Sequence, residues 1–367
     1  SSPITGFYLL VVFWMLLSYL FSNYQSFENV EWWISEYWKF LVVFVLISIG
    51  IKDQREAVFI LLGFAGVTTL YQAHTWFDFV QGGSYVYQQG IRRIIGVWSG
   101  GGLGAANGYA SMAVATIPLG YFAYRVGWAR WIRLSGLFAI GISTLSVLYS
   151  GTRGAFITGA LIGGLILIRH AGFWRSATLM LVLAGSVWIV LPPELKERYT
   201  DLSLSGAKRG MTREEEISAS SAQSRIEGFV DGINMANDRP VFGHGPGSSS
   251  LARLQYRNLE LPLQLHNLYG QVLAELGYVG FAFWLCLIAV SIASARRIAN
   301  RPNAPPFVNE SGTCLFYLLV SLIVYGAVSH NLFKDEWIFY WSLLIALARP
   351  DVSDAKAKLI RRSGGIE

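Results

Sequence analysis

Ionisable side chains stand beside apolar runs in five separate stretches of this sequence, and their types suit one kind of chemistry. Guanidinium groups bind phosphate through paired N–H donors, and an imidazole with a pKa near ~6.5 accepts a proton at neutral pH. Together they would stabilise a departing phosphate while a nucleophilic hydroxyl loses its proton. The candidate residues are Arg92 with Arg93, Arg153, Arg225, His266 and His330.

Most of these residues also have an interpretation without catalysis. The two adjacent arginines are each expected to reach lipid phosphates, and Arg225 on a solvated helix would be a surface charge. His266 would cap a helix, and His244 in GHGPG is expected to be a turn residue. For Arg153 we favour a functional role, because the glycines of SGTRG leave the backbone uncovered by side chains, as in a tight turn that holds an oxyanion.

The composition indicates a membrane protein. Of 367 residues, 53% are hydrophobic and 14% are charged, whereas soluble domains carry about 25% charged residues. The basic residues behind the net charge of +6 are dispersed between apolar runs, which indicates contact with membrane lipids and argues against a nucleic-acid partner. A bilayer needs about 20 apolar residues per span, so the runs predict an all-α polytopic fold with about ten helices. They are 4–22, 38–51, 55–73, 103–124, 132–149, 153–168, 176–191, 266–294, 312–329 and 335–349.

The positions of Lys and Arg predict the side of the membrane that each connection faces. Alternate short connections, among them 125–133 and 296–301, are rich in basic residues and are expected in the cytoplasm. Both termini then lie in the cytoplasm and the long connection lies outside. The predicted organisation is an N-terminal bundle of about seven helices, an outer helical loop, about three C-terminal helices and a basic cytoplasmic tail, over 1–191, 192–265, 266–349 and 350–367 respectively.

The outer loop has the pattern of a small helical cap. Residues 192–199 look like a helix start, with proline in the first turn. Residues 213–240 carry apolar side chains at spacings of three and four, which predicts an amphipathic helix that ends before Pro240. The sequence GHGPGSSS (243–250) predicts a glycine-rich turn.

Several motifs are absent, which restricts the chemistry. The sequence has no GxxxxGK[ST] element of a P-loop ATPase, and no Asp-x-Asp pair in the outer loop to hold a metal with a nucleotide sugar. Cysteine and histidine do not occur at zinc-ligand spacing. We therefore expect a site without ATP, cofactor or bound metal.

Four motifs in order resemble the bacterial O-antigen ligase and polymerase family. They are SGTRGAF at the start of a membrane helix, an arginine in the outer loop, the DRPVFGHGPG turn, and HNLYGQVLAELGYVGF at the exit of that loop. Each motif is weak alone, but their order and spacing are fairly specific. The resemblance covers about residues 100–340, whereas the N-terminal helices match only in being hydrophobic.

The resemblance implies glycosyl transfer on the periplasmic side of the bacterial inner membrane, with inversion, no metal and no nucleotide. The donor would be a glycan on undecaprenyl diphosphate, and the acceptor a sugar hydroxyl of lipid A-core or a similar glycan. It also implies a GT-C-like fold with up to 12 helices in a full-length chain. Arg153, Arg225 and His266 match the family's essential residues, and His330 a less uniform position. The further candidates for substrate binding are Arg92, Arg93, His244, Asn267 and Tyr269.

Three alternatives stay open at this stage. A polymerase would extend the lipid-linked glycan by the same chemistry, and a protein O-oligosaccharyltransferase would use a serine acceptor. A transporter of lipid-linked sugars belongs to a different class and should show broken or charged segments at the bilayer midplane, often in two related halves. The ionisable groups of this chain gather at one membrane boundary and no internal repeat is visible, which favours an enzyme.

Overall fold

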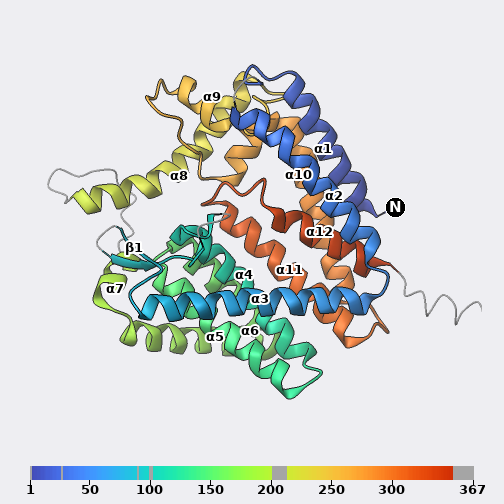
Figure 1. Cartoon of the computed structure of the whole chain (residues 1–367), viewed down its shortest axis with the longest axis vertical. Coiled ribbons are helices and arrows are strands. Elements are labelled where there is room, and N and C mark those ends of the chain that lie inside the picture. Colours follow the sequence, from blue (N-terminus) through green and yellow to red (C-terminus); the bar gives the residue numbers. More distant parts are fainter. Residues whose placement is uncertain (1, 26–27, 89–90, 99–101, 201–212, 350–367) are drawn as a thin grey trace, which may run out of the picture. The chain divides into compact units, whose positions relative to one another are not determined.

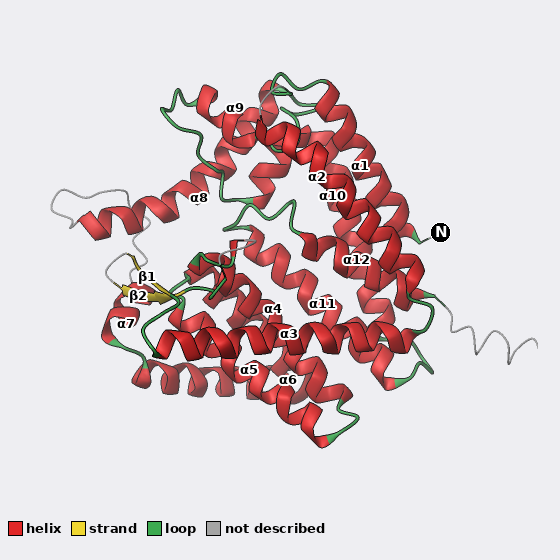
Figure 2. Cartoon of the chain, viewed as in Figure 1, coloured by secondary structure: helices red, strands yellow, loops and turns green. Residues whose placement is uncertain are grey.

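The computed structural model describes residues 2–25, 28–88, 91–98, 102–200 and 213–349, and most of them are helical (Figure 1). A short antiparallel hairpin, β1 (Tyr85–Gln88) and β2 (Ile91–Ile94), lies between the third and fourth helices (Figure 2). The all-α class is confirmed. The helices are α1 (Pro3–Leu20), α2 (Glu28–Gly50), α3 (Gln54–Val80), α4 (Ala106–Val126), α5 (Arg130–Tyr149), α6 (Arg153–Val190), α7 (Pro193–Thr200), α8 (Arg213–Asp238), α9 (Ser249–Tyr256), α10 (Leu268–Ala299), α11 (Pro306–Gly326) and α12 (Asp335–Ala348).

The helices identify a multi-pass membrane protein. Among the described residues, six helices are long and apolar enough to cross a membrane, and they are α1, α3, α5, α6, α10 and α11. All ten predicted apolar runs lie largely within helices, and two of them share α6, whose backbone breaks at Gly172. Helix α12 has 14 residues, fewer than the roughly 20 that a perpendicular span requires. Ten crossings and a GT-C-like arrangement stay predictions.

The predicted elements of the outer loop are confirmed, and one element near it was missed. Helix α7 begins at Pro193, and α8 ends at Asp238, two residues before Pro240. The hairpin was not predicted, because its eight residues form no apolar run. Its register pairs Tyr85 with Ile94 and Gln88 with Ile91.

The chain divides into two compact units, each built from segments that are distant in the sequence. Unit 1 comprises Ser1–Leu61, Glu227–Leu319 and Ser329–Glu367. Unit 2 comprises Leu62–Ile226 and Val320–Val328. The segments predicted from the sequence were contiguous, whereas α3, α8 and α11 each contribute residues to both units.

Small side chains allow the helices of unit 2 to pack closely. Helices α4 and α5 approach each other so closely that a Cβ on Gly136 would lie 2.5 Å from the carbonyl oxygen of Gly120. Close packing through small residues is typical of membrane helices. The core beside this contact consists of buried residues from α4, α5, α6 and the end of α11, namely Ala110, Ala113, Val114, Val147, Ala155 and Tyr325.

Unit 1 is organised around a break in α10. Gly277 has φ 68° and interrupts the helix, so carbonyl groups of the preceding turn lose their partners within the helix. Helix α1 supplies replacement donors: Ser18 Oγ donates to the Glu275 carbonyl at 2.8 Å, and Trp14 Nε1 donates to the Leu276 carbonyl at 3.0 Å. The 240–245 turn supplies two more through backbone N–H groups, from residue 244 to the carbonyl of residue 274 and from residue 245 to that of residue 275.

The close approach of this turn to the break explains why glycine stands at position 277. A Cβ there would lie 2.6 Å from the carbonyl oxygen of Val241 and 2.7 Å from that of Pro240. The motif DRPVFGHGPG and the motif ELGYVG are therefore two sides of one backbone contact.

We expect Gly277→Ala to destabilise the protein by at least about 1–3 kcal/mol, because alanine is strained at positive φ and its methyl group would collide with two carbonyls. Thermal unfolding of the purified protein in detergent measures this as a lower Tm. Gly163→Ala in α6 is the matched control, since a Cβ there meets no atom within 4 Å. Equal Tm values for the two variants would contradict this account of the break.

Candidate functional site

The turn that carries Arg153 joins α5 to α6 in unit 2. Ser150 and Thr152 in this turn are buried, and Arg153 is the first residue of α6. Ser150 Oγ donates to the Val147 carbonyl at 2.7 Å and accepts the Thr152 N–H at 3.2 Å, which fixes the turn locally. The partly exposed Arg153 side chain thus leaves from a rigid turn at a helix N-terminus, where backbone N–H groups favour anions.

Arg93 braces this turn from the hairpin. Its side chain is only 4% exposed, and its Nε donates to the Ser150 carbonyl at 2.7 Å. Its Nη2 donates to Thr152 Oγ1 at 3.0 Å and to Asn107 Oδ1 at 3.1 Å, while Nη1 donates to Gln88 Oε1 at 3.0 Å. All three nitrogens are therefore held by protein oxygens. Arg93 positions the Arg153 turn, and its predicted contact with substrate stays a prediction.

Arg92 points to the other face of the hairpin, as alternation along a strand requires. It is exposed, its Nη2 donates to the Phe79 carbonyl at 2.8 Å, and its guanidinium lies over the rings of Phe79 and Tyr85, at 4.5 and 4.2 Å from their centroids. Cation–π contacts hold it at the surface of unit 2. Substrate binding by Arg92 likewise stays a prediction.

Arg225 lies on α8, in the part of that helix that belongs to unit 2. Its Nε donates to the Val328 carbonyl at 3.2 Å. Burial lowers the pKa of Arg225, Tyr325 raises it, and the positive charge of Arg153 lowers it further. Burial also lowers the pKa of Arg93, with a smaller contribution in the same direction from Arg225. We call Arg93, Arg153 and Arg225 the arginine cluster; the charge of Arg225 repels those of Arg93 and Arg153, and an anion would relieve that repulsion.

His266 and His330 form an imidazole pair in unit 1. Their Nδ1 atoms are 3.2 Å apart, and their ring centroids are 5.0 Å apart with the planes inclined at 59°. Desolvation by the surrounding protein lowers the pKa of His330, and the positive charge of Lys334 lowers it further. The lowered pKa favours the uncharged form of His330, in which one ring nitrogen can accept a hydrogen bond. The sequence did not predict this pairing of residues 64 positions apart.

The backbone at His266 is held in an unusual conformation. Its φ of 50° lies in the left-handed region, which costs a non-glycine residue roughly 1–3 kcal/mol and persists where the surroundings impose it. The next residue, Asn267, caps α10 by accepting the Gly270 N–H at 3.0 Å. The preceding carbonyl, of Leu265, packs against α8 so closely that a Cβ on Gly228 would lie 1.8 Å from it.

A buried ion pair secures the chain that leads into His266. Arg253 and Asp231 have side chains 3% and 1% exposed, with Nε and Oδ2 2.8 Å apart. Arg253 Nη1 also donates to the Gln264 carbonyl at 2.9 Å, two residues before His266. Arg257 adds a second bridge to Asp231 at 2.7 Å. The pair links α8, α9 and the 257–265 connection, and sequence reasoning missed it because its members come from different elements.

The remaining predicted binding residues have structural partners in unit 1. His244 Nε2 lies 3.1 Å from the Met235 carbonyl, and burial lowers the pKa of His244. Asn267 serves as the helix cap. Tyr269 is half-buried, with its ring centroid 6.0 Å from that of Trp284. A role of these three in binding substrate stays a prediction.

Glu275 is a structural residue of this region that sequence reasoning did not single out. Its side chain is fully buried, and it accepts from the Gly247 N–H at 2.9 Å, Ser249 Oγ at 2.6 Å and Gln271 Nε2 at 3.2 Å. The carboxylate therefore ties the start of α9 and the glycine-rich turn to α10. A buried carboxylate requires such donors.

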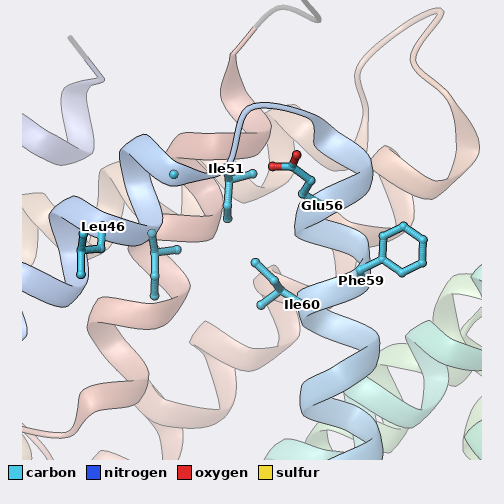
Figure 3. Close-up of a pocket in the computed structure, with 7 residues that line it drawn as sticks. Leu46, Ile51, Glu56, Phe59 and Ile60 are labelled. Carbon is cyan, nitrogen blue, oxygen red and sulfur yellow. The ribbon is translucent and has the colours of Figure 1, made fainter.

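Two further features bear on where chemistry can occur. Within the described part of the chain, no group of three or more His, Cys, Asp or Glu side chains is arranged to hold a metal ion. A pocket of about 510 Å³ lies where α2 meets α3 (Figure 3). Its lining is apolar except for Glu56, which accepts the Lys52 N–H at 2.9 Å, so we assign it no catalytic role.

Comparison with known proteins points to one family. Residues 137–285 match the model of a family described as O-antigen ligase, and this span includes Arg153, Arg225 and His266. A Rickettsia prowazekii protein named as a candidate polysaccharide ligase is 27% identical over 254 residues, covering 60% of this chain and 56% of the relative. A similarly named Rickettsia typhi protein is 25% identical over 237 residues, covering 59% and 53%. The chain spans about half the length of these relatives. The predicted resemblance is confirmed.

We expect Asp231→Asn to lower the free energy of unfolding by about 3–5 kcal/mol, because the buried Arg253 then keeps only its long, 4.0 Å ion pair with the partly exposed Glu227. Glu36→Gln is the matched control, since its ion pair with Lys39 is exposed and should contribute less than about 1 kcal/mol. Thermal unfolding in detergent compares the two. Similar small losses in both variants would show that the buried pair does not secure the chain before His266.

Proposed function

We propose that the chain, whose residues 137–285 match the O-antigen ligase family model, is a membrane glycosyltransferase that moves a glycan from undecaprenyl diphosphate to a sugar hydroxyl of lipid A-core. The arginine cluster of unit 2 is the observation that carries this proposal. Guanidinium groups that repel one another around Arg225, with Arg93 held by buried hydrogen bonds, suit a diphosphate. Arg153 and Arg225 would bind it, and Arg93 would position Arg153.

The reaction would proceed by direct displacement. The acceptor oxygen attacks the anomeric carbon, and the bond from that carbon to the phosphate oxygen breaks with its electron pair leaving on the diphosphate. Each guanidinium that meets this developing charge in a partly dehydrated site contributes roughly 2–4 kcal/mol of transition-state stabilisation. Attack opposite the leaving group inverts the anomeric configuration. The arginines supply the positive charge that other transferases obtain from a metal.

The imidazole pair of unit 1 would remove the proton of the acceptor hydroxyl. When His266 Nδ1 carries a hydrogen, it can donate to Nδ1 of the neutral His330, 3.2 Å away. His266 Nε2 is then unprotonated and available as a general base, which typically contributes about 10²–10⁴-fold in rate. His330 thus acts as a positioning residue that selects the tautomer of His266.

We place the reaction at the periplasmic face of the bacterial inner membrane. Six described helices are long and apolar enough to cross a bilayer, and the excess of Lys and Arg in alternate connections supports this orientation. Extension of a lipid-linked glycan and transfer to a protein serine would use the same residues.

Purified protein in nanodiscs, given undecaprenyl-diphosphate glycan with lipid A-core or with a second lipid-linked glycan, separates these functions. Product on lipid A-core indicates a ligase, and ladders on the carrier indicate a polymerase. Intact glycolipid that binds without product indicates a transporter or another acceptor.

We expect His266→Ala to lower the transfer rate by about 10²–10⁴-fold, because the acceptor loses its base. Arg153→Lys should lose roughly 10²-fold, because lysine cannot reproduce the paired N–H donors of a guanidinium. Arg130→Lys, a conservative exchange of an exposed arginine at the start of α5, is the control and should retain wild-type turnover. Wild-type turnover in His266→Ala or Arg153→Lys would remove that residue from the mechanism.

The pH profile of transfer should reflect the lowered pKa of His330. Protonation of His330 removes its acceptor nitrogen, so activity should fall only below about pH 6.5, the ordinary histidine value. Lys334→Gln removes a positive charge that lowers this pKa. The fall in transfer rate at low pH (the acid limb of the profile) should therefore move to higher pH, with little change in the maximal rate. Lys39→Gln, which alters an exposed lysine elsewhere, should leave the limb in place. An unmoved acid limb in Lys334→Gln would exclude His330 as its source.

A further inference from the structure

A second cationic site lies in unit 1, where α1 begins and α10 and α12 end. A cavity of about 580 Å³ opens there. None of the residues that line it is acidic, and the apolar part of its lining includes Ile298 and Ile345. Its polar lining consists of three arginines and three hydroxyl side chains, namely Arg297, Arg301, Arg349, Ser2, Thr5 and Ser294.

Backbone carbonyl groups near helix ends accept hydrogen bonds from two of the three arginines. Arg301 Nη2 donates to the Leu347 carbonyl at 3.0 Å, and Arg349 Nη1 donates to the Ile51 carbonyl at 3.4 Å. The Arg297 side chain is exposed and makes no hydrogen bond within the described residues. Each guanidinium has five N–H donors, so most of these donors remain available. In the part of the chain that the structure describes, no carboxylate forms an ion pair with any of the three.

The geometry points to a phosphate group as the ligand, and we propose that this cavity binds one. Three cations without a counter-charge around hydroxyl groups recognise phosphate through charge-assisted hydrogen bonds. Helices α1 and α10 are both long and apolar enough to cross a membrane, so the cavity lies at an end of two such helices. Phospholipid head groups gather at that depth, and the apolar Ile298 and Ile345 suit the glycerol and first methylene groups of a lipid.

This cavity is separate from the residues proposed for glycosyl transfer. Arg153, Arg225, His266 and His330 do not line it. The inference therefore stands or fails independently of the proposed function. The general excess of Lys and Arg at one membrane face is the competing explanation, and Arg296 provides the control for it. Arg296 is adjacent in α10 and also exposed, but its guanidinium lies 4.9 Å from the Phe316 ring centroid and outside the cavity lining.

The test is native mass spectrometry of the purified full chain with added phosphatidylglycerol, and separately with inorganic phosphate. We expect the wild type to retain phosphatidylglycerol, and Arg297→Gln and Arg349→Gln each to reduce retention about fivefold, corresponding to about 1 kcal/mol per basic residue near a lipid surface. Arg296→Gln should retain the lipid as the wild type does. Since the Arg297 side chain makes no hydrogen bond in the described residues, Arg297→Gln should keep the wild-type Tm.

The outcomes distinguish the source of the phosphate. Retention of phosphatidylglycerol that depends on Arg297 and Arg349 identifies a lipid head group. Phosphate binding with the same dependence, but without lipid retention, identifies a soluble phosphate. Equal binding in all variants, or an equal loss in Arg296→Gln, overturns the proposal.

Discussion

The carbonyl groups freed at the Gly277 break of α10 must find donors, because a membrane interior offers no water to replace a lost helical hydrogen bond. Ser18 and Trp14 of α1 and the backbone of the 240–245 turn supply them. One interruption thereby joins three segments of unit 1 that are far apart in the sequence. Glu275, two residues before Gly277, adds a side-chain anchor to the same turn.

The two sets of proposed catalytic residues are held by different physical means. In unit 2, a buried guanidinium fixes a turn through neutral oxygen acceptors, so the positive charge of the arginine cluster is retained. In unit 1, a buried ion pair and a close helix contact hold the chain before His266. The next residue, His266 itself, has a φ in the left-handed region. In the proposed mechanism, the first arrangement would hold an anion, and the second would fix the orientation of the His266 imidazole.

Much of the fold could be predicted from the sequence, because long apolar runs and the proline after α8 are local signals. The Arg153 turn, the amphipathic α8 and the glycine-rich turn were all visible in this way. The partners of Arg93 could not be predicted, since Ser150, Thr152 and Asn107 lie 14 to 59 residues away. The contact of His266 with His330 and that of Asp231 with Arg253 depend on tertiary packing for the same reason. The hairpin escaped because four-residue strands with polar and aromatic side chains carry a weak signal.

The β1–β2 hairpin places two neighbouring arginines in opposite environments, Arg92 exposed and Arg93 buried. Side chains alternate along a strand, so a shift of the pairing by one residue would exchange the two positions. The buried position 93 requires a side chain with the paired N–H donors and the length of arginine. The exposed position 92 requires only a side chain that tolerates contact with water and with an aromatic ring. During evolution this segment should accept exchanges at position 92 more readily than insertions or deletions. A change of length would remove the brace from the Arg153 turn without altering either arginine.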